Sequence, residues 1–188
     1  MFAFSERYDA ALAFAARAHL HQLRKGTDIP YIAHVVHVST ILLRHGFDED
    51  LAIAGLLHDV IEDCGVSQET VAAEFGAEVA RLVVAVSKPP GDLEWEAAKT
   101  AKLDQIAVGG PAVAALKAAD AIHNAHSVSH DLQRLGPIIW ERFKRGPEPT
   151  LGYYTAILTR VRGWLGDHPI AAELAATVAE LDQSINRT

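Results

Sequence analysis

Apolar residues recur at three- and four-residue intervals along most of the chain, which is the spacing of one face of an α-helix. In the first segment these positions are Ala11, Leu12, Ala15, Ala18 and Leu20. Polar stretches and stretches with Gly or Pro interrupt the pattern and divide it into helices. The expected helices cover residues 5–23, 31–44, 49–63, 67–75, 77–87, 93–108, 112–132, 150–165 and 168–184.

Local signals support these boundaries. Ser5, Asp48 and Ser67 stand where helix N-caps are expected, and Pro30 can occupy a first helical turn. Alternating strand patterns are absent from the sequence, alanine is abundant and β-branched runs are scarce. We therefore expect an all-α helical bundle, with breaks at 88–91, 109–111 and 146–149.

The length of 188 residues suits one domain with a real hydrophobic core. We find no internal repeat and no linker long enough to separate domains. The whole chain, 1–188, is therefore expected to form a single domain. Its core motifs lie in 19–130, and C-terminal helices in 147–185 complete the bundle.

Charge and cysteine content narrow the class of protein. The formal net charge is −7, whereas a nucleic-acid-binding domain is usually basic. No apolar run reaches the roughly 18 residues of a membrane span, and Glu6, Arg7 and Asp9 fall where a signal peptide should turn apolar. Cys64 is the single cysteine, which excludes a disulfide framework. A cytoplasmic protein without nucleic-acid or membrane partners is expected, of undetermined oligomeric state.

Four ionisable residues interrupt apolar helical segments, where each is costly unless it is paired or binds a metal. His58 and Asp59 are adjacent inside the segment 54–63, and His34 and Asp120 each interrupt another apolar segment. Taken singly, each could be an ordinary core or surface residue. Taken together, two imidazoles and two carboxylates from three helices predict one bound divalent metal ion at the centre of the bundle.

Two acidic residues follow His58 and Asp59 along the same predicted helix. Glu62 comes four residues after His58 and Asp63 four after Asp59, so each is expected one turn beyond a ligand. A bound metal ion lowers the pKa of its water, and Glu62 is placed to take or orient that proton. Asp63 either shares this role or positions another group. The mixed nitrogen and oxygen ligands suit manganese, iron or cobalt.

A substrate with several phosphates needs local cations on a chain of this charge. Arg24 and Lys25 are the first candidates, because their loop precedes His34 by ten residues. Tyr153 or Tyr154 could contact a ribose or base, or lie in the core. The other candidate cations, each of which could equally be a solvated surface residue, are Lys102, Lys117, Arg142, Lys144 and Arg145.

The remaining histidines and Cys64 are given ordinary structural roles. Cys64 has no cationic activator beside it, so a small buried thiol is expected rather than a nucleophile. His123 is adjacent to Asn124, but nothing in the sequence demands that it act as a ligand. The site also does not require His19, His21, His37, His45, His126, His130 or His168.

Four segments together resemble a known family: 24–34 (RKGTDIPYIAH), 54–63 (AGLLHDVIED), 74–83 (EFGAEVARLV) and 117–124 (KAADAIHN). Their order and spacing, over about residues 5–130, resemble the hydrolase domain of Rel/Spo alarmone enzymes, and in particular the small alarmone hydrolases of the HD superfamily. The resemblance implies an all-helical fold that removes the 3′-diphosphate of guanosine tetra- or pentaphosphate. It implies a manganese ion bound by His34, His58, Asp59 and Asp120, catalysis by Glu62 and Asp63, and nucleotide contacts by Arg24, Lys25 and Asn124, the last near the reacting phosphate.

The sequence departs from the family pattern at a few positions. Val35 replaces a usual proline, His37 a small residue and Cys64 a common threonine. None of these changes removes a ligand, so they affect the substrate assignment more than the chemistry. One alternative is an HD phosphohydrolase acting on an adenosine alarmone or a nucleoside monophosphate. A nucleotide-binding module without turnover is disfavoured, because the ligands, Glu62 and Asp63 are all present.

Overall fold

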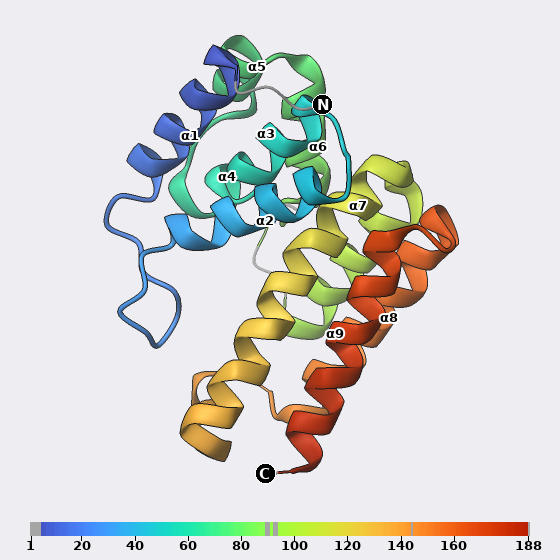
Figure 1. Cartoon of the computed structure of the whole chain (residues 1–188). Helices are drawn as coiled ribbons and strands as arrows, with labels where there is room; N and C mark the ends of the chain where they lie inside the picture. The colour runs from blue at the N-terminus through green and yellow to red at the C-terminus, as the bar shows by residue number, and fades with distance from the viewer. Residues whose placement is uncertain (1–4, 89–90, 92–93, 144, 188) are drawn as a thin grey trace.

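The computed structural model describes residues 5–187 except 89–90, 92–93 and 144. Figure 1 shows a helical molecule, and the described residues contain no β-strand apart from an isolated bridge between Leu23 and Pro30. The predicted all-α class is confirmed. None of the described helices is long and apolar enough to cross a bilayer. The elements are α1 (Glu6–Ala18), α2 (Ile32–Arg44), α3 (Glu49–Leu57), α4 (Val60–Cys64), α5 (Gln68–Phe75), α6 (Ala77–Val86), α7 (Trp95–Leu135), the 3₁₀ helix η1 (Gly136–Arg142), α8 (Pro147–Leu165) and α9 (Pro169–Asn186).

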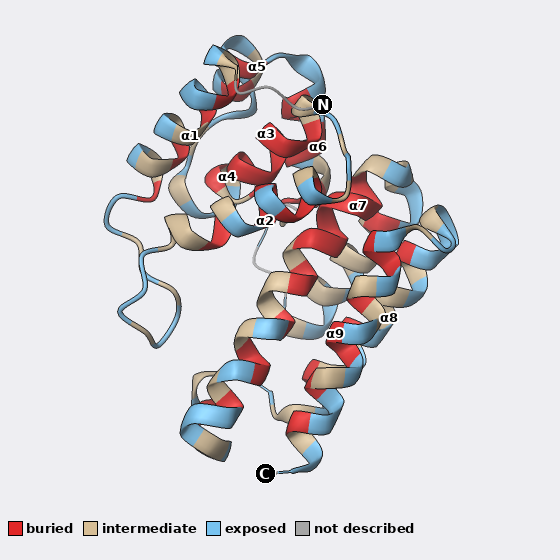
Figure 2. Ribbon diagram, viewed as in Figure 1, coloured by how far each residue is buried: buried red, intermediate tan, exposed pale blue. Residues whose placement is uncertain are grey.

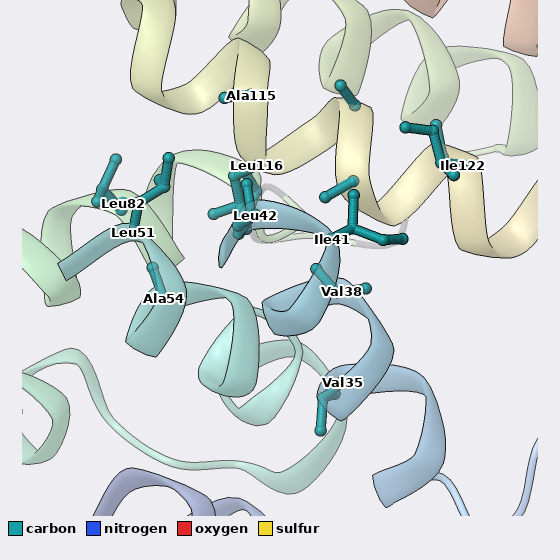
Figure 3. Close-up of a cluster of buried hydrophobic side chains, with 14 of the residues drawn as sticks. Val35, Val38, Ile41, Leu42, Leu51, Ala54, Leu82, Ala115, Leu116 and Ile122 are labelled. Carbon is teal, nitrogen blue, oxygen red and sulfur yellow. The ribbon is translucent and has the colours of Figure 1, made fainter. Parts of the chain in front are cut away.

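Helix α3 is the most buried element of the N-terminal half. Every residue from Leu51 to Leu57 is buried, and Figure 2 shows α3 coloured as buried over most of its length, as expected for a helix that is apolar on all sides. Helices α1, α2, α6 and α7 pack around it. Figure 3 shows this core, in which the labelled side chains are Val35, Val38, Ile41 and Leu42 from α2, Leu51 and Ala54 from α3, Leu82 from α6, and Ala115, Leu116 and Ile122 from α7.

Helix α7 connects the two halves of the molecule. The break expected at 109–111 is present as a kink, because Gly110 has φ 83° and ψ 179° before Pro111 begins a new helical run. Only glycine adopts this conformation without strain. The run after the kink packs along α8 and α9 (Figure 1) and also contacts α2. It thereby places Asp120 opposite α2, which carries His34, and the end of α3, which His58 follows.

Four predicted boundaries were wrong. The helix expected to end at residue 132 ends at Leu135. The helix expected over 49–63 ends at Leu57 and resumes at Val60, and Asp59 between them, with φ −107° and ψ −2°, departs from ideal α-helical angles. Glu62 and Asp63 therefore do not share a continuous helix with His58. The first helix ends at Ala18 instead of residue 23. Helix α8 begins at Pro147, within an expected break, because proline fits a first helical turn. Residue 93, the expected start of the sixth helix, lies outside the described residues.

The segment 19–31 forms a loop that extends from the helices beside α2 (Figure 1). The Arg24 N–H donates to the Ile29 carbonyl at 2.8 Å, and the Tyr31 N–H donates to the Gln22 carbonyl at 2.9 Å. Gly26, with φ +70°, lies against η1, where an added Cβ would be 2.6 Å from Arg142 Cδ. These contacts fix the position of Arg24 relative to the bundle.

The close contact of α2 and α3 leads to a stability prediction. A Cβ on Gly55 would lie 2.9 Å from Leu42 Cδ1 and 3.0 Å from Ser39 Cα. We expect Gly55→Ala to lower the free energy of unfolding by about 1–3 kcal/mol, as overpacking does. Gly163→Ala is the control, because that exposed position in α8 has open space around it, and it should raise stability by about 0.5–1 kcal/mol. Chemical denaturation measures both changes, and a neutral Gly55→Ala would contradict the tight packing.

Candidate metal centre

Three predicted ligands meet at one point in the interior. His34 comes from α2, His58 directly follows α3, and Asp120 lies on α7. One ligand atom from each of the three lies within 4.8 Å of the other two, the only such group of three or more found among the described residues. Both imidazoles are buried, with relative exposures of 1% and 2%.

The distances fit a shared cation. His34 Nε2 lies 3.4 Å from Asp120 Oδ1, and His58 Nε2 lies 3.8 Å from the same oxygen. Ligand atoms bound at about 2.1 Å from one ion lie roughly 3–4 Å from one another. Neither Nε2 atom has a hydrogen-bond partner in the described structure, although both are buried. A buried nitrogen without a partner is costly, and a metal ion would satisfy both atoms.

Asp59 lies beside this group. Its Oδ2 is 2.9 Å from His58 Nε2 and 3.7 Å from His34 Nε2, and it accepts a hydrogen bond from the Tyr31 hydroxyl at 2.6 Å. The Asp59 carboxylate therefore lies next to both imidazoles. Its place as a fourth ligand stays a prediction.

The electrostatics of these side chains favour bound positive charge. Burial opposes the charged form of His58, but the carboxylates of Asp59 and Asp120 outweigh it and raise the pKa of His58 to about 9. Burial also opposes ionisation of Asp120, yet Lys117 and the imidazoles hold its pKa well below the usual range. A divalent cation would supply positive charge in place of the proton on His58.

Hydrogen bonds orient the ligands from outside. His58 Nδ1 lies 2.9 Å from the Gly55 carbonyl, which directs Nε2 toward the centre. Lys117 Nζ donates to Asp120 Oδ2 at 2.6 Å. Asn124 donates to the other oxygen of Asp120 and accepts from Arg24 at 2.6 Å. The predicted substrate residues Asn124 and Arg24 thus contact the ligand group through one chain of hydrogen bonds.

The two acidic residues of α4 have different partners. Glu62 accepts from Lys102 Nζ and from the Lys88 backbone N–H, both at 2.9 Å. Asp63 accepts from Gln22 Nε2 at 2.7 Å. Both carboxylates line the same cavity as Asp59, so the structure brings them to the metal centre although the helix predicted to place them there is interrupted.

Two cavities meet beside the ligands. The smaller, of about 220 Å³, is lined by Asp59, Glu62, Asp63 and Asp120 and by three lysines. The larger, of about 460 Å³, is bounded by the 19–31 loop, α2, α7 and η1. Both include Arg24, Tyr31, Asn124 and Tyr154 in their walls. Of the predicted substrate residues, two line the larger cavity, Lys25 and Arg142, and three line the smaller, Lys102, Lys117 and Tyr153. Arg145 lines neither cavity and pairs with Glu96. Lys144 lies outside the described residues.

Sequence reasoning missed several residues of these cavities. Lys99 lines the smaller one, with Nζ 4.0 Å from the centre of the Tyr153 ring. Burial, with help from Lys102 and Lys117, lowers the pKa of Lys99 to about 8. The spacing of Lys99 and Lys102, three residues apart on one helix face, could have indicated it.

Four histidines for which no role in the site was predicted also line a cavity. His37, His123, His126 and His130 line the larger cavity. Burial, together with His34 and Arg24, lowers the pKa of His123 to about 3, so this ring is neutral at neutral pH. Nothing in the periodicity of the sequence distinguishes these histidines from surface residues. Cys64, which contacts His19 at 3.3 Å, has its pKa raised by burial and nearby aspartates, consistent with an unreactive thiol.

Comparisons with known proteins agree with this geometry. A family model described as "HD domain" matches residues 11–144. The guanosine-3′,5′-bis(diphosphate) 3′-pyrophosphohydrolase MESH1 of Drosophila melanogaster is 35% identical over 144 residues, which are 75% of this chain and 78% of that protein. A probable guanosine-3′,5′-bis(diphosphate) 3′-pyrophosphohydrolase of Synechocystis is 33% identical over 159 residues. The chain spans only 20% of that protein. It spans 15% of a probable GTP pyrophosphokinase of Mycobacterium leprae and 18% of a GTP pyrophosphokinase of Streptomyces coelicolor.

Solved structures show the same likeness. A structure described as a metazoan orthologue of SpoT that hydrolyses ppGpp matches with a TM-score of 0.77 at 28% identity, covering 100% of this chain and 98% of that one. The crystal structure of lmo0812 from Listeria monocytogenes matches with a TM-score of 0.73 at 33% identity, covering 80% of this chain and 99% of that one.

Proposed function

The chain belongs to the HD-domain family, and from this premise we propose that it is a guanosine-3′,5′-bis(diphosphate) 3′-pyrophosphohydrolase. The reaction would join a water oxygen to the phosphorus next to the ribose and break the bond from that phosphorus to the 3′ oxygen. The 3′ oxygen takes up a proton. The products are pyrophosphate and a nucleoside 5′-diphosphate.

The observation that carries the proposal is the division of the site into two cavities with different chemistry. The smaller combines the carboxylates that would bind a metal or handle a proton with the ammonium groups of Lys99, Lys102 and Lys117. Lys102 and Lys117 are ion-paired to Glu62 and Asp120, and Lys99 has no ion-pair partner in the described structure. A diphosphate fits this arrangement, because it brings several negative charges to a place that already gathers cations.

The larger cavity has room for the nucleoside and its second diphosphate. Lys25 and Arg142 supply cations in its wall, and the imidazole rings supply flat surfaces against which a base can stack. Arg24 and Asn124 stand where the two cavities meet. A ribose 3′ oxygen at this junction would have its phosphates on one side and its base on the other.

The residues present fit a divalent ion, since two buried imidazole nitrogens without hydrogen-bond partners face two carboxylates. Such an ion, bound by His34, His58, Asp59 and Asp120, would offset phosphate charge and lower the pKa of a bound water. Manganese is the ion proposed. Glu62 accepts the proton of the attacking water, and Asp63, fixed by Gln22, either shares that task or holds the water.

The residue at position 37 keeps the choice between guanine and adenine open. His37, which replaces a small residue of the family pattern, lines the larger cavity where the base would lie. An imidazole there changes both the space and the hydrogen-bonding groups available to a purine. An adenosine alarmone is therefore the second candidate substrate, followed by a nucleoside monophosphate.

A substrate panel tests the proposal. The purified manganese-loaded protein is offered guanosine 3′,5′-bis(diphosphate), its adenosine counterpart and nucleoside monophosphates, and released pyrophosphate and orthophosphate are measured separately. We expect pyrophosphate in equal amount to the nucleoside 5′-diphosphate. Orthophosphate from a monophosphate, with both alarmones resistant, would refute the alarmone assignment and leave the wider HD-hydrolase function standing.

The cations of the 19–31 loop should act on substrate binding and not on the metal. Loss of a charge-assisted contact costs about 1.5–3 kcal/mol, so Lys25→Ala should raise KM by roughly ten- to a hundredfold. Bound manganese should stay at the wild-type amount. Arg81→Ala, which removes an exposed cation of α6 paired to Glu78, is the matched control. A change in metal content with unchanged KM would contradict this role for Lys25.

A further inference from the structure

The two imidazoles of the metal centre are held in different ways. His58 directs Nδ1 to a backbone carbonyl, which is a common arrangement for a metal-binding histidine. His34 directs Nδ1 to another imidazole instead. Its Nδ1 lies 2.8 Å from Nδ1 of His123, with the ring centroids 4.8 Å apart and the planes inclined at 47°.

The proton in this contact can be assigned from the chemistry of the site. His34 Nε2 faces the Asp120 carboxylate and needs a free lone pair to bind a cation. A neutral imidazole that offers Nε2 carries its proton on Nδ1. His34 Nδ1–H therefore donates, His123 Nδ1 accepts, and the proton of His123 is on its Nε2.

We propose that His123 is a positioning residue that holds His34 in the tautomer and ring orientation needed to bind the divalent ion. The proposal rests on the metal centre assigned above, but it is independent of the identity of the substrate. His123 touches neither Asp59 nor Asp120 through any hydrogen bond in the described structure, so its effect passes through His34.

His123 is itself held by a second ring from α2. The His37 ring stacks on it, with centroids 4.9 Å apart and planes inclined at 25°. His37 Nδ1 lies 2.7 Å from the Ala33 carbonyl, one turn back in α2, which restrains the His37 ring. Each group therefore holds the next: the α2 backbone restrains His37, His37 stacks on His123, and His123 contacts His34.

The placement of His123 on α7 gives this support a structural basis. His123 follows Asp120 by three residues and precedes Asn124, so ligand, positioning residue and substrate contact share one face of the helix. The contact with His34 also joins α7 to α2 at the metal centre. The tautomer of one ligand and the position of another thus depend on the packing of the same two helices.

Leucine and asparagine have nearly the same shape, which makes them a matched pair for a test. His123→Leu removes the acceptor, whereas His123→Asn keeps an oxygen close to the position of Nδ1. Loss of a group that orients a ligand typically costs about 10- to 100-fold in metal affinity. We expect His123→Leu to weaken Mn²⁺ binding by this factor and His123→Asn to recover most of it.

The measurement is a titration with Mn²⁺ alone, followed by electron paramagnetic resonance of the free ion, without substrate. Circular dichroism and thermal unfolding show that each variant is folded, and His123→Phe, which keeps a ring without an acceptor, replaces the leucine variant if that one does not fold. His126→Leu is the control, because His126 lines the same cavity but has no contact with His34.

Unchanged Mn²⁺ affinity in folded His123→Leu or His123→Phe would overturn the proposal. Equal weakening in the leucine and asparagine variants would also overturn it, since shape and not the acceptor would then matter. A wild-type protein that binds Mn²⁺ normally but turns over no alarmone would refute the proposed substrate and leave this inference standing. Absence of Mn²⁺ binding in the wild type would refute both.

Discussion

Replacing Asp59 by alanine should remove the bound metal and the activity together. The carboxylate lies 2.9 Å from His58 Nε2 and 3.7 Å from His34 Nε2, so its loss leaves two imidazoles and one carboxylate around the ion. Substitution of groups that only orient ligands already costs about 10- to 100-fold in affinity, and removal of a ligand should cost more. Metal content after dialysis and turnover of the alarmone measure the two effects.

The matched control is Asp104→Ala, which removes an exposed aspartate of α7 that lines neither cavity. It should keep one equivalent of metal and normal turnover. If Asp59→Ala behaved in the same way, Asp59 would not be a ligand, and the centre would consist of His34, His58 and Asp120 alone. Thermal unfolding of each variant separates loss of the ion from loss of the fold.

Much of the fold could be predicted because its signals are local. The Ser5, Asp48 and Ser67 side chains accept from backbone N–H groups at the starts of α1, α3 and α5, as their positions in the sequence indicate. The kink at Gly110 likewise follows from adjacent glycines and a proline. These features depend on a few neighbouring residues, which a single sequence contains in full.

The break in the helix before Val60 could not be predicted in the same way. The segment 54–63 is apolar and has no glycine or proline at the break, so periodicity favours a continuous helix. The Asp59 carboxylate meets Tyr31 and His34, which lie in other segments of the chain, so its conformation reflects tertiary contacts. The residues that gather at the candidate metal centre could be recognised from sequence, whereas the path of the backbone between them could not.

The residues that surround the candidate ligands, His123 and Lys99 among them, could not be predicted for a related reason. His34 and His123 are 89 positions apart, and only the packing of α2 on α7 brings their Nδ1 atoms to a distance of 2.8 Å. Lys99 gains its importance from the lysines and Tyr153 that surround it in the folded chain. A polar residue on an exposed-looking helix face gives no sign in the sequence of what the opposite helix will place against it.

Replacing Glu62 by glutamine should leave the metal in place and slow turnover. The amide keeps the size of the side chain and can still accept from the Lys88 N–H, but it cannot take a proton from water. General-base catalysis contributes about 10²- to 10⁴-fold, so we expect kcat to fall by roughly a hundredfold or more. Steady-state kinetics and metal content of the same preparation provide the measurement, with Glu69→Gln, at an exposed position of α5, as the control.

The ion pair between Glu62 and Lys102 requires a second variant, because Glu62→Gln also weakens that pair. Lys102→Met breaks the same pair and keeps the carboxylate, so it should raise KM through lost phosphate binding and change kcat much less than Glu62→Gln does. An equal fall in kcat in both variants would assign the effect to the ion pair. Unchanged turnover in Glu62→Gln would remove Glu62 from the chemistry and leave Asp63 as the acidic side chain beside the metal centre able to accept the proton.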